Sequence, residues 1–172
     1  ILLVGNEKAI RKHLPPLYKR RGIEIVHCDD YIRMDESAGT GLRKRNEASL
    51  VVAARLVKDG KAQALVSAGN TGALMAMSKL ALRTMPGLDR PALAALLPTL
   101  IDDDVVMLDL GANRECDARN LVQFAIMGAA YSRIVTGRER PRVRLLNIGT
   151  EAIKGTDEVQ EAAQHLRDAT TL

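Results

Sequence analysis

The chain alternates between short runs that are almost wholly apolar and longer segments in which apolar residues recur every three or four positions. Short apolar runs are typical of strands in a parallel sheet that is covered on both faces, and the longer segments have the spacing of amphipathic helices. The runs predict strands at residues 2–4, 23–27, 64–66, 105–110 and 143–148, with 92–97 as a further candidate. The helical spacing predicts helices at residues 7–18, 47–59, 71–82 and 117–130, and a last helix that begins near Thr156.

This alternation of strands and helices predicts an α/β fold, in which a mostly parallel sheet carries helices on both faces. A chain of 172 residues, 47% of them hydrophobic, is long enough to bury a substantial core. We therefore expect residues 1–172 to form a single α/β domain. Because the chain opens inside an apolar run at Ile1 and closes just after a predicted helix, we expect it to be a fragment of a larger catalytic domain.

Glycines and small polar residues follow four of the predicted strands. They are Gly5-Asn6, residues 67–72, residues 111–113 and Gly149-Thr150. The carboxyl ends of parallel strands meet at one edge of a sheet, and ligands bind at that edge. These four segments are therefore expected to line one binding edge.

Residues 67–72 are the strongest candidate for an anion site among these segments. The glycines allow a tight turn and a close approach to a ligand, and the free amides of the helix that follows attract negative charge. The candidate phosphate ligands are Ser67, Gly69, Asn70, Thr71 and Gly72. The alternative is a glycine-rich turn that serves packing alone.

Charge and aromatic content bear on the class of partner. The net charge of +4 favours an acidic partner, and basic residues cluster at 19–21 and 43–45, although such clusters are usually ordinary solvated surface. With one Phe, three Tyr and no Trp, the chain has few side chains that could stack on bases. Nucleic acid is therefore not an expected partner.

The cysteines and acidic residues predict no metal site. Cys28 and Cys116 lack the spacing of metal ligands or of a disulfide framework, which suits a reducing cytoplasm. The acidic run at residues 102–104 is expected to be a solvated turn. No apolar run is long enough to span a membrane, and no signal-peptide pattern is present.

Several blocks of sequence, in a fixed order, resemble those of one family. They are residues 3–6, 66–73, 89–92, 108–113, 123–128, 145–149 and 154–155. In these blocks the chain resembles the phosphate acyltransferase family, PlsX, along essentially its whole length. The resemblance implies an enzyme of bacterial phospholipid synthesis that needs no cofactor. It would convert acyl-acyl carrier protein and inorganic phosphate to acyl phosphate and free carrier protein.

The resemblance also carries expectations about fold and assembly. It implies a Rossmann-like fold related to phosphotransacetylases and isocitrate dehydrogenases, a cytoplasmic homodimer, and peripheral association with the membrane. The chain departs from the family at Ala48-Ser49, where a pair of serines is usual, and at Thr150, where a glutamate is common. The family's Asp-Ala-Met-Gly-Gly-Asp and Asp-Gly-Phe-x-Gly-Asn blocks are missing from this sequence.

The implied reaction needs a site that holds a phosphate dianion and stabilises an oxyanion. Lys154 follows the predicted strand 143–148 and is the candidate for the positive charge, with a plain surface lysine as the alternative. Asn113 and Asn147 are candidates for orienting the thioester or the phosphate, although amides at strand ends often only satisfy loop backbone groups. These three are the candidate catalytic residues.

Other functions remain open beside this one. Arg43, Lys44 and Ser49 are candidates for closing over the site or meeting the acidic carrier protein, and exposed salt bridges are the alternative. A short-chain phosphotransacetylase would use the same phosphate chemistry with acyl-coenzyme A. A non-catalytic scaffold at the membrane is a further alternative. A dehydrogenase is disfavoured because no strand end shows the dinucleotide fingerprint.

Overall fold

The computed structural model describes residues 1–37, 39, 45–100 and 104–169. The chain divides into two compact units, Ile1–Met85 and Pro86–Leu172, and each is described here by itself. Both units contain helices and short strands, which confirms the predicted mixture of α and β structure. The expectation of a single domain stays a prediction.

Unit 1 contains a two-stranded parallel sheet. Strand β1 (Leu2–Gly5) pairs with β2 (Glu24–His27), in a register that sets Leu2 opposite Glu24 and Gly5 opposite His27. The connection carries helix α1 (Glu7–Arg11) and the 3-10 turn η1 (Tyr18–Arg21), and Gly22 closes it with a φ of 69°. The predicted helix 7–18 was expected to be interrupted or to end near Pro15-Pro16, because proline disfavours helical backbone just before it and supplies no N–H group, and α1 ends earlier still, at Arg11.

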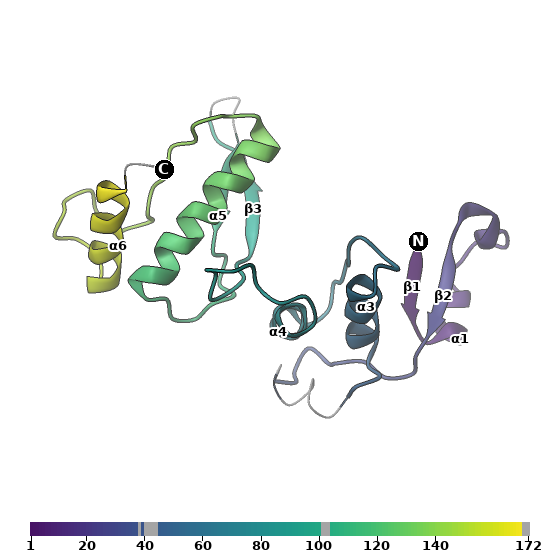
Figure 1. Cartoon of the computed structure of the whole chain (residues 1–172). Helices are drawn as coiled ribbons and strands as arrows, with labels where there is room; N and C mark the ends of the chain where they lie inside the picture. Colours follow the sequence, from purple (N-terminus) through teal and green to yellow (C-terminus); the bar gives the residue numbers. More distant parts are fainter. Residues whose placement is uncertain (38, 40–44, 101–103, 170–172) are drawn as a thin grey trace. The chain divides into compact units, whose positions relative to one another are not determined.

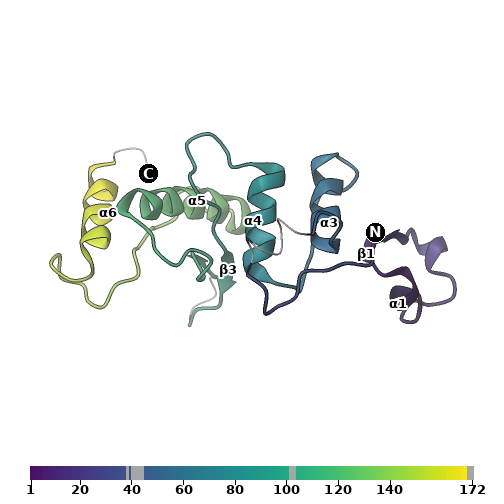
Figure 2. The same cartoon turned by 90° about the horizontal axis from the view of Figure 1, so that it is seen from below.

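Two helices complete unit 1 and lie side by side (Figures 1 and 2). Helix α3 (Ser49–Lys58) and helix α4 (Thr71–Leu82) confirm two predicted helices. Between them is a small core of Ile32, Ala48, Val51 and Ala73, against which Leu50 and Met77 pack. Most side chains of α4 are apolar, yet Leu80 is 60% exposed. Leu82, near the end of the same helix, is 49% exposed.

The predicted strand at residues 64–66 is wrong for this structure. These residues are all described and form no strand, and Val66 is 99% exposed. An apolar run forms a strand only when a neighbouring strand supplies hydrogen-bond partners for its backbone. The one strand that pairs with β1 among the described residues is β2, not residues 64–66. The run is apolar, but within the described part of the chain no strand pairs with it.

Unit 2 contains an antiparallel pair of strands. Strand β3 (Ala94–Leu97) pairs with β4 (Val105–Leu108), which sets Ala94 opposite Leu108 and Leu97 opposite Val105. This confirms the candidate strand at 92–97 and part of the one at 105–110. The pair was expected to belong to a parallel sheet, but a short connection favours a hairpin, because a parallel crossover needs a dozen or more residues.

Helices α5 and α6 pack together in unit 2, and α5 also contacts β4 (Figure 1). Helix α5 (Ala118–Thr136) is capped at its start by Asp117, whose side chain accepts a hydrogen bond from the Asn120 amide at 2.7 Å. Gly137, with a φ of 73°, caps its end. Helix α6 (Asp157–Asp168) has acidic residues in its first turn, as the sequence predicted. The positions of these helices confirm the sequence analysis, although α5 extends past residue 130.

The predicted strand at 143–148 also forms no strand. Its side chains nevertheless alternate between half-buried and exposed, and the exposed ones include Leu146 and Ile148. This is the burial pattern of a strand that lacks a hydrogen-bonded neighbour. The described strands form two separate pairs, so the expected Rossmann-like sheet is not confirmed and stays a prediction. In the part of the chain described, no helix combines the length and the apolar character needed to cross a membrane.

Candidate functional site

Asn70 anchors the glycine-rich turn of unit 1 to a neighbouring loop. Its Oδ1 accepts a hydrogen bond from the Ala73 amide at 2.9 Å, so it caps helix α4. Its Nδ2 lies 3.1 Å from the Arg33 carbonyl oxygen and 2.9 Å from that of Glu36, with the carbonyl of Met34 at 3.4 Å. Both ends of the amide are thus engaged by the protein. Asn70 holds the turn in place instead of presenting a free donor to a ligand.

The other predicted phosphate ligands are exposed around this cap. The first intrahelical hydrogen bond of α4 runs from the Leu74 amide to the Asn70 carbonyl, so the amides of Thr71 and Gly72 have no partner within the helix. Ser67 accepts a hydrogen bond from the Gly69 amide at 3.2 Å through its Oγ, which leaves its hydroxyl proton free to donate elsewhere. The amides of Thr71 and Gly72 and the hydroxyl of Ser67 are therefore among the groups at this turn that can meet an anion.

The loop that Asn70 grips is itself braced by Arg45. The Arg45 guanidinium contacts Asp30 Oδ1 at 2.6 Å and Glu36 Oε1 at 2.8 Å, and it is only 33% exposed. Ser49 starts helix α3 and donates its amide to the Asp30 carbonyl at 2.9 Å. Arg43 and Lys44, predicted to close over the site or to meet the carrier protein, lie outside the described residues.

In unit 2, Asn113 is bound to the backbone and carboxylate of its own turn. Its Nδ2 donates to the Pro91 carbonyl at 2.9 Å and to Asp109 Oδ2 at 3.0 Å. The Asp109 carboxylate also accepts from the amides of Leu93 at 2.8 Å and of Asn113 at 2.7 Å. Burial opposes ionisation of Asp109, but these hydrogen bonds outweigh it and hold its pKa below the ordinary value of 3.8.

Asn147 and Lys154 are brought together by a tight loop. The Asn147 Nδ2 donates to the Lys154 carbonyl at 2.9 Å, and its Oδ1 accepts from the Ile148 amide at 2.8 Å. Gly155 lies directly against Asn147, since a Cβ added there would be 2.6 Å from Asn147 Oδ1. Gln160 of α6 fixes the loop further by donating to the carbonyls of Ile153 and Gly155, both at 3.2 Å.

The Lys154 side chain lies over Gly149. A Cβ added at Gly149 would be 2.9 Å from Lys154 Cγ and 2.7 Å from Glu151 Oε2, so a side chain at this position would force Lys154 and Glu151 to move. Lys154 is exposed, and no hydrogen bond or ion pair of its ammonium group is found within the described residues. Lys154 thus combines a fixed backbone with an ammonium group that has no partner in the described part of the chain.

The candidate residues fall into separate groups. Ser67 to Gly72 belong to unit 1, whereas Asn113, Asn147 and Lys154 belong to unit 2. Within unit 2, Asn147 and Lys154 share one loop, and among the described residues no hydrogen bond joins Asn113 to either of them. Whether the predicted residues form one active site stays a prediction.

Sequence reasoning missed a polar cluster in unit 2. The buried Gln123 accepts a hydrogen bond from the Asp89 amide at 3.0 Å and donates to the Gly87 carbonyl at 2.9 Å and to Asp89 Oδ2 at 3.0 Å. Arg119 Nε adds an ion pair to Asp89 Oδ2 at 2.9 Å. A polar Gln on the apolar face of a predicted helix was the signal that could have revealed this cluster.

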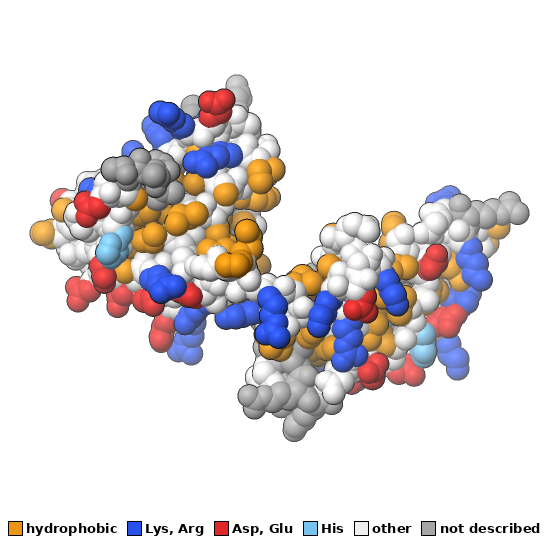
Figure 3. Space-filling model, in the orientation of Figure 1, with side chains coloured by type: hydrophobic (Ala, Val, Ile, Leu, Met, Phe, Trp, Pro, Cys, Tyr) orange, Lys and Arg blue, Asp and Glu red, His pale blue; other side chains and the backbone are white. Residues whose placement is uncertain are grey.

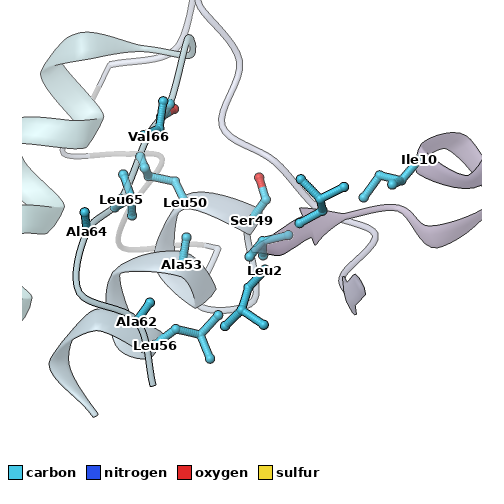
Figure 4. A pocket seen from close by; sticks show the side chains of 13 residues that line it. Leu2, Ile10, Ser49, Leu50, Ala53, Leu56, Ala62, Ala64, Leu65 and Val66 are labelled. Carbon is cyan, nitrogen blue, oxygen red and sulfur yellow. The ribbon is translucent and has the colours of Figure 1, made fainter. Parts of the chain in front are cut away.

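Each unit also contains a pocket whose lining combines apolar side chains with polar groups. The pocket of unit 2, about 780 Å³ in volume, lies between α5, β4 and the segment that follows α5, and Asn147 and Gly149 are among its lining residues. The pocket of unit 1, about 350 Å³, lies between β1, α3 and residues 62–67 (Figure 4). Apolar side chains are exposed on both units as well (Figure 3). No group of three or more potential metal ligands is found among the described residues.

Comparison with known proteins gives one consistent result. The family described as "fatty acid synthesis protein" matches residues 1–172. A protein named phosphate acyltransferase from Erythrobacter litoralis is 64% identical over 172 residues, covering 99% of this chain and 48% of that protein. Proteins of the same name from Shewanella halifaxensis and Shewanella woodyi are 50% and 47% identical, covering 97% and 98% of this chain and 49% and 50% of their own lengths. The chain thus spans about half the length of the curated relatives it matches.

Proposed function

The chain belongs to the fatty acid synthesis protein family that matches residues 1–172, and from this premise we propose that the full-length protein is a phosphate acyltransferase. It transfers the acyl group of acyl-acyl carrier protein to inorganic phosphate, which yields acyl phosphate and free carrier protein. The observation that carries this proposal is the 64% identity, over 172 residues, to a relative named phosphate acyltransferase. Its place would be in fatty acid and phospholipid synthesis.

The chemistry needs no covalent intermediate with the protein. A phosphate oxygen attacks the thioester carbonyl, a C–O bond forms, and negative charge moves to the carbonyl oxygen. Collapse of this tetrahedral species breaks the C–S bond and releases the thiolate of the carrier protein, which takes up a proton. The protein contributes by alignment and by stabilising the oxyanion.

We assign the phosphate to the turn at residues 67–72. The support is the pair of open amides at Thr71 and Gly72, the free hydroxyl proton of Ser67, and the positive end of the α4 dipole. Gly69 lets the turn pass close to a ligand, and Asn70 positions the turn through its cap and its bonds to the 33–36 loop. Asn70 thus serves phosphate binding as a positioning residue.

Lys154 is assigned to stabilise the developing negative charge. Its support is an exposed ammonium group on a backbone that Asn147 fixes with a 2.9 Å hydrogen bond. Asn147 and Asn113 act in this proposal through the loops that they hold, because the donors of both amides are already bound to protein carbonyls or to Asp109.

We further propose that the full-length protein forms a Rossmann-like, mostly parallel sheet and a cytoplasmic homodimer that associates with the membrane surface. The support is the resemblance of the sequence blocks to the phosphate acyltransferase family. The strand-like alternation of burial along residues 143–148 also favours a sheet with more strands than the described residues contain.

The deciding experiment measures release of carrier-protein thiol by the full-length protein, with and without inorganic phosphate. Long-chain acyl-acyl carrier protein and the matching acyl-coenzyme A are compared at equal concentrations. We expect phosphate-dependent thiol release and acyl phosphate from the carrier-protein substrate. A strong preference for acyl-coenzyme A would establish a phosphotransacetylase instead. No reaction with either thioester, together with binding of the carrier protein, would leave a non-catalytic scaffold.

A further inference from the structure

Arginines are concentrated at the end of helix α5 and in the segment that follows it. Residues 133–144 contain five arginines, one glutamate, and no lysine or aspartate. The net charge of this segment equals that of the whole chain, which is +4. Such a concentration of one sign of charge attracts an acidic partner, provided that the arginines are not already neutralised by the protein's own carboxylates.

Three of these arginines are exposed at alternate positions of the chain. Residues 141–147 contain no helix, turn or bend, and the exposed Arg142 and Arg144 alternate with half-buried residues. Arg140, at the bend just before them, is exposed as well. Alternate side chains of an extended chain lie on one face, about 6.6 Å apart. We call Arg140, Arg142 and Arg144 the arginine row.

The arginine row has no acidic partner in the part of the chain that the structure describes. Arg144 donates a hydrogen bond to the Val143 carbonyl at 3.2 Å, and none of the three arginines forms an ion pair there. Arg45 of unit 1 shows the contrast, because Asp30 and Glu36 both contact its guanidinium and neutralise it. The arginine row therefore keeps its charge available for a partner.

The segment that carries the row is fixed at both ends. Before the row, Arg133 Nε of helix α5 donates to the Glu139 carbonyl at 3.1 Å. After the row, Asn147 donates to the Lys154 carbonyl at 2.9 Å. Three residues of extended chain, about 10 Å, separate Arg144 from Asn147. The row thus ends about 10 Å along the chain from the residue that holds the Lys154 loop.

We propose that the arginine row is the docking surface for an acidic helix of the carrier protein that delivers the acyl thioester. Carboxylates four residues apart on a helix are separated by about 6 Å along its axis, which is close to the spacing of the row. Each guanidinium binds a carboxylate through two parallel hydrogen bonds. This inference rests on the activity proposed above, to which it adds the place where the carrier protein binds.

An anionic lipid surface is the other partner that exposed arginines attract. A bilayer spreads its charge in two dimensions and favours a broad basic patch, whereas a helix offers its carboxylates in a line, as the row requires. The row also lies next to the segment that holds Lys154, where the proposed reaction needs the thioester carbonyl. A membrane contact has no need of that position. The arrangement therefore favours the carrier protein.

The test measures binding of holo-carrier protein without an acyl group to the full-length protein, by isothermal titration calorimetry. The row variant combines Arg140→Gln, Arg142→Gln and Arg144→Gln. The control variant removes the same charge from exposed lysines of unit 1, through Lys8→Gln, Lys12→Gln and Lys19→Gln. We expect Kd to rise about tenfold in the row variant alone, and to depend less on salt there than in wild type.

Steady-state kinetics separate docking from chemistry. In the row variant we expect KM for the acyl-acyl carrier protein to rise about tenfold, with kcat and KM for inorganic phosphate unchanged. Damage to the Lys154 loop would lower kcat as well, so a fall in kcat would contradict a role in docking alone.

Several binding results would overturn the proposal. They are an unchanged Kd in the row variant, an equal rise in both variants, and no binding by wild type. Loss of binding to phosphatidylglycerol vesicles, with wild-type affinity for the carrier protein, would assign the row to a membrane instead. Binding that depends on the row, without any turnover, would support the docking surface and refute the proposed activity. Turnover with binding that is independent of the row would do the reverse.

Discussion

The side chain of Asn147 donates a hydrogen bond to the backbone carbonyl of Lys154 at 2.9 Å, and so ties the end of one extended segment to the lysine seven residues later. The same side chain accepts from the Ile148 amide at 2.8 Å, so a single amide closes the loop from both ends. This relationship connects two candidate residues that the sequence could only name separately. It makes Asn147 a positioning residue for Lys154.

Replacement of Asn147 tests this role directly. Asn147→Ala removes both hydrogen bonds, and we expect the free energy of unfolding to fall by about 1 kcal/mol. If the lost positioning is felt in the transition state, kcat for phosphate-dependent thiol release falls about fivefold. Asn147→Asp keeps the acceptor for Ile148 but loses the donor to Lys154, so it should lie between Ala and wild type. A rise in KM with unchanged kcat and stability would instead indicate direct substrate binding.

Gly155 is predicted to tolerate no side chain. Its φ of 91° disfavours other residues, and an added Cβ would lie 2.6 Å from Asn147 Oδ1. Gly137→Ala is the matched control, because its φ is 73° but an added Cβ meets nothing within 4 Å. We expect Gly137→Ala to cost about 1 kcal/mol from backbone strain alone, and Gly155→Ala to cost about 1 kcal/mol more. Urea unfolding of the full-length variants measures both, and equal losses would show that the loop yields without cost.

Lys154 is expected to act through its charge. Removing a group that stabilises an oxyanion typically lowers kcat by about 100-fold to 1,000-fold. Because the Lys154 side chain is exposed, we expect Lys154→Ala to lower kcat by about 100-fold. Lys154→Arg keeps the charge and should recover part of the loss. Lys58→Ala, an exposed lysine of α3, is the control and should leave kcat nearly unchanged. Full activity in Lys154→Ala would show that Lys154 is a surface lysine without a catalytic role.

The helices could be predicted from the sequence because their signals are local. Apolar spacing predicted α3 and α4, and Asp117 marked the start of α5 through its own cap. Proline shortened the first helix for an equally local reason. Strands depend on partners that can be distant in sequence, so equally apolar runs do not all form strands. Residues 105–108 pair with β3, whereas residues 64–66 and 143–148 pair with no strand among the described residues.

The candidate site was predictable to the same extent. The helix amides at Thr71 and Gly72 follow from a glycine-rich turn before a helix, which is a local pattern. The structural roles of Asn70 and Asn113 could not be predicted from the sequence. Their hydrogen-bond partners at residues 33–36 and at Pro91 are more than 20 positions away. The sequence identifies an amide at a turn, and only the fold shows that its donors are already used.

Asn70 gives a sharp distinction between a ligand and a positioning residue. Asn70→Ala loses the helix cap and the bonds to the 33–36 loop, and we expect a loss of about 1–2 kcal/mol in the free energy of unfolding. Asn70→Ser restores the cap but not the loop contacts, so it should recover about half of that loss. Both are measured by urea unfolding beside the KM for phosphate. A large rise in KM for phosphate with wild-type stability would show that Asn70 binds the anion itself.

Asp109 should make stability depend on pH in the acidic range. Hydrogen bonds from Leu93 and Asn113 outweigh its burial and hold its folded-state pKa below 3.8. The unfolded chain therefore takes up the proton first as the pH falls, so the stabilisation is fully present above about pH 5 and is lost as the pH falls through the lower folded-state pKa. Asp109→Asn cannot ionise, and the difference in free energy of unfolding between wild type and this variant should shrink steadily below about pH 4. Urea unfolding of both proteins between about pH 3 and pH 7 measures that difference. A difference that stays constant across the range would mean that the carboxylate charge is not what holds the 109–113 turn.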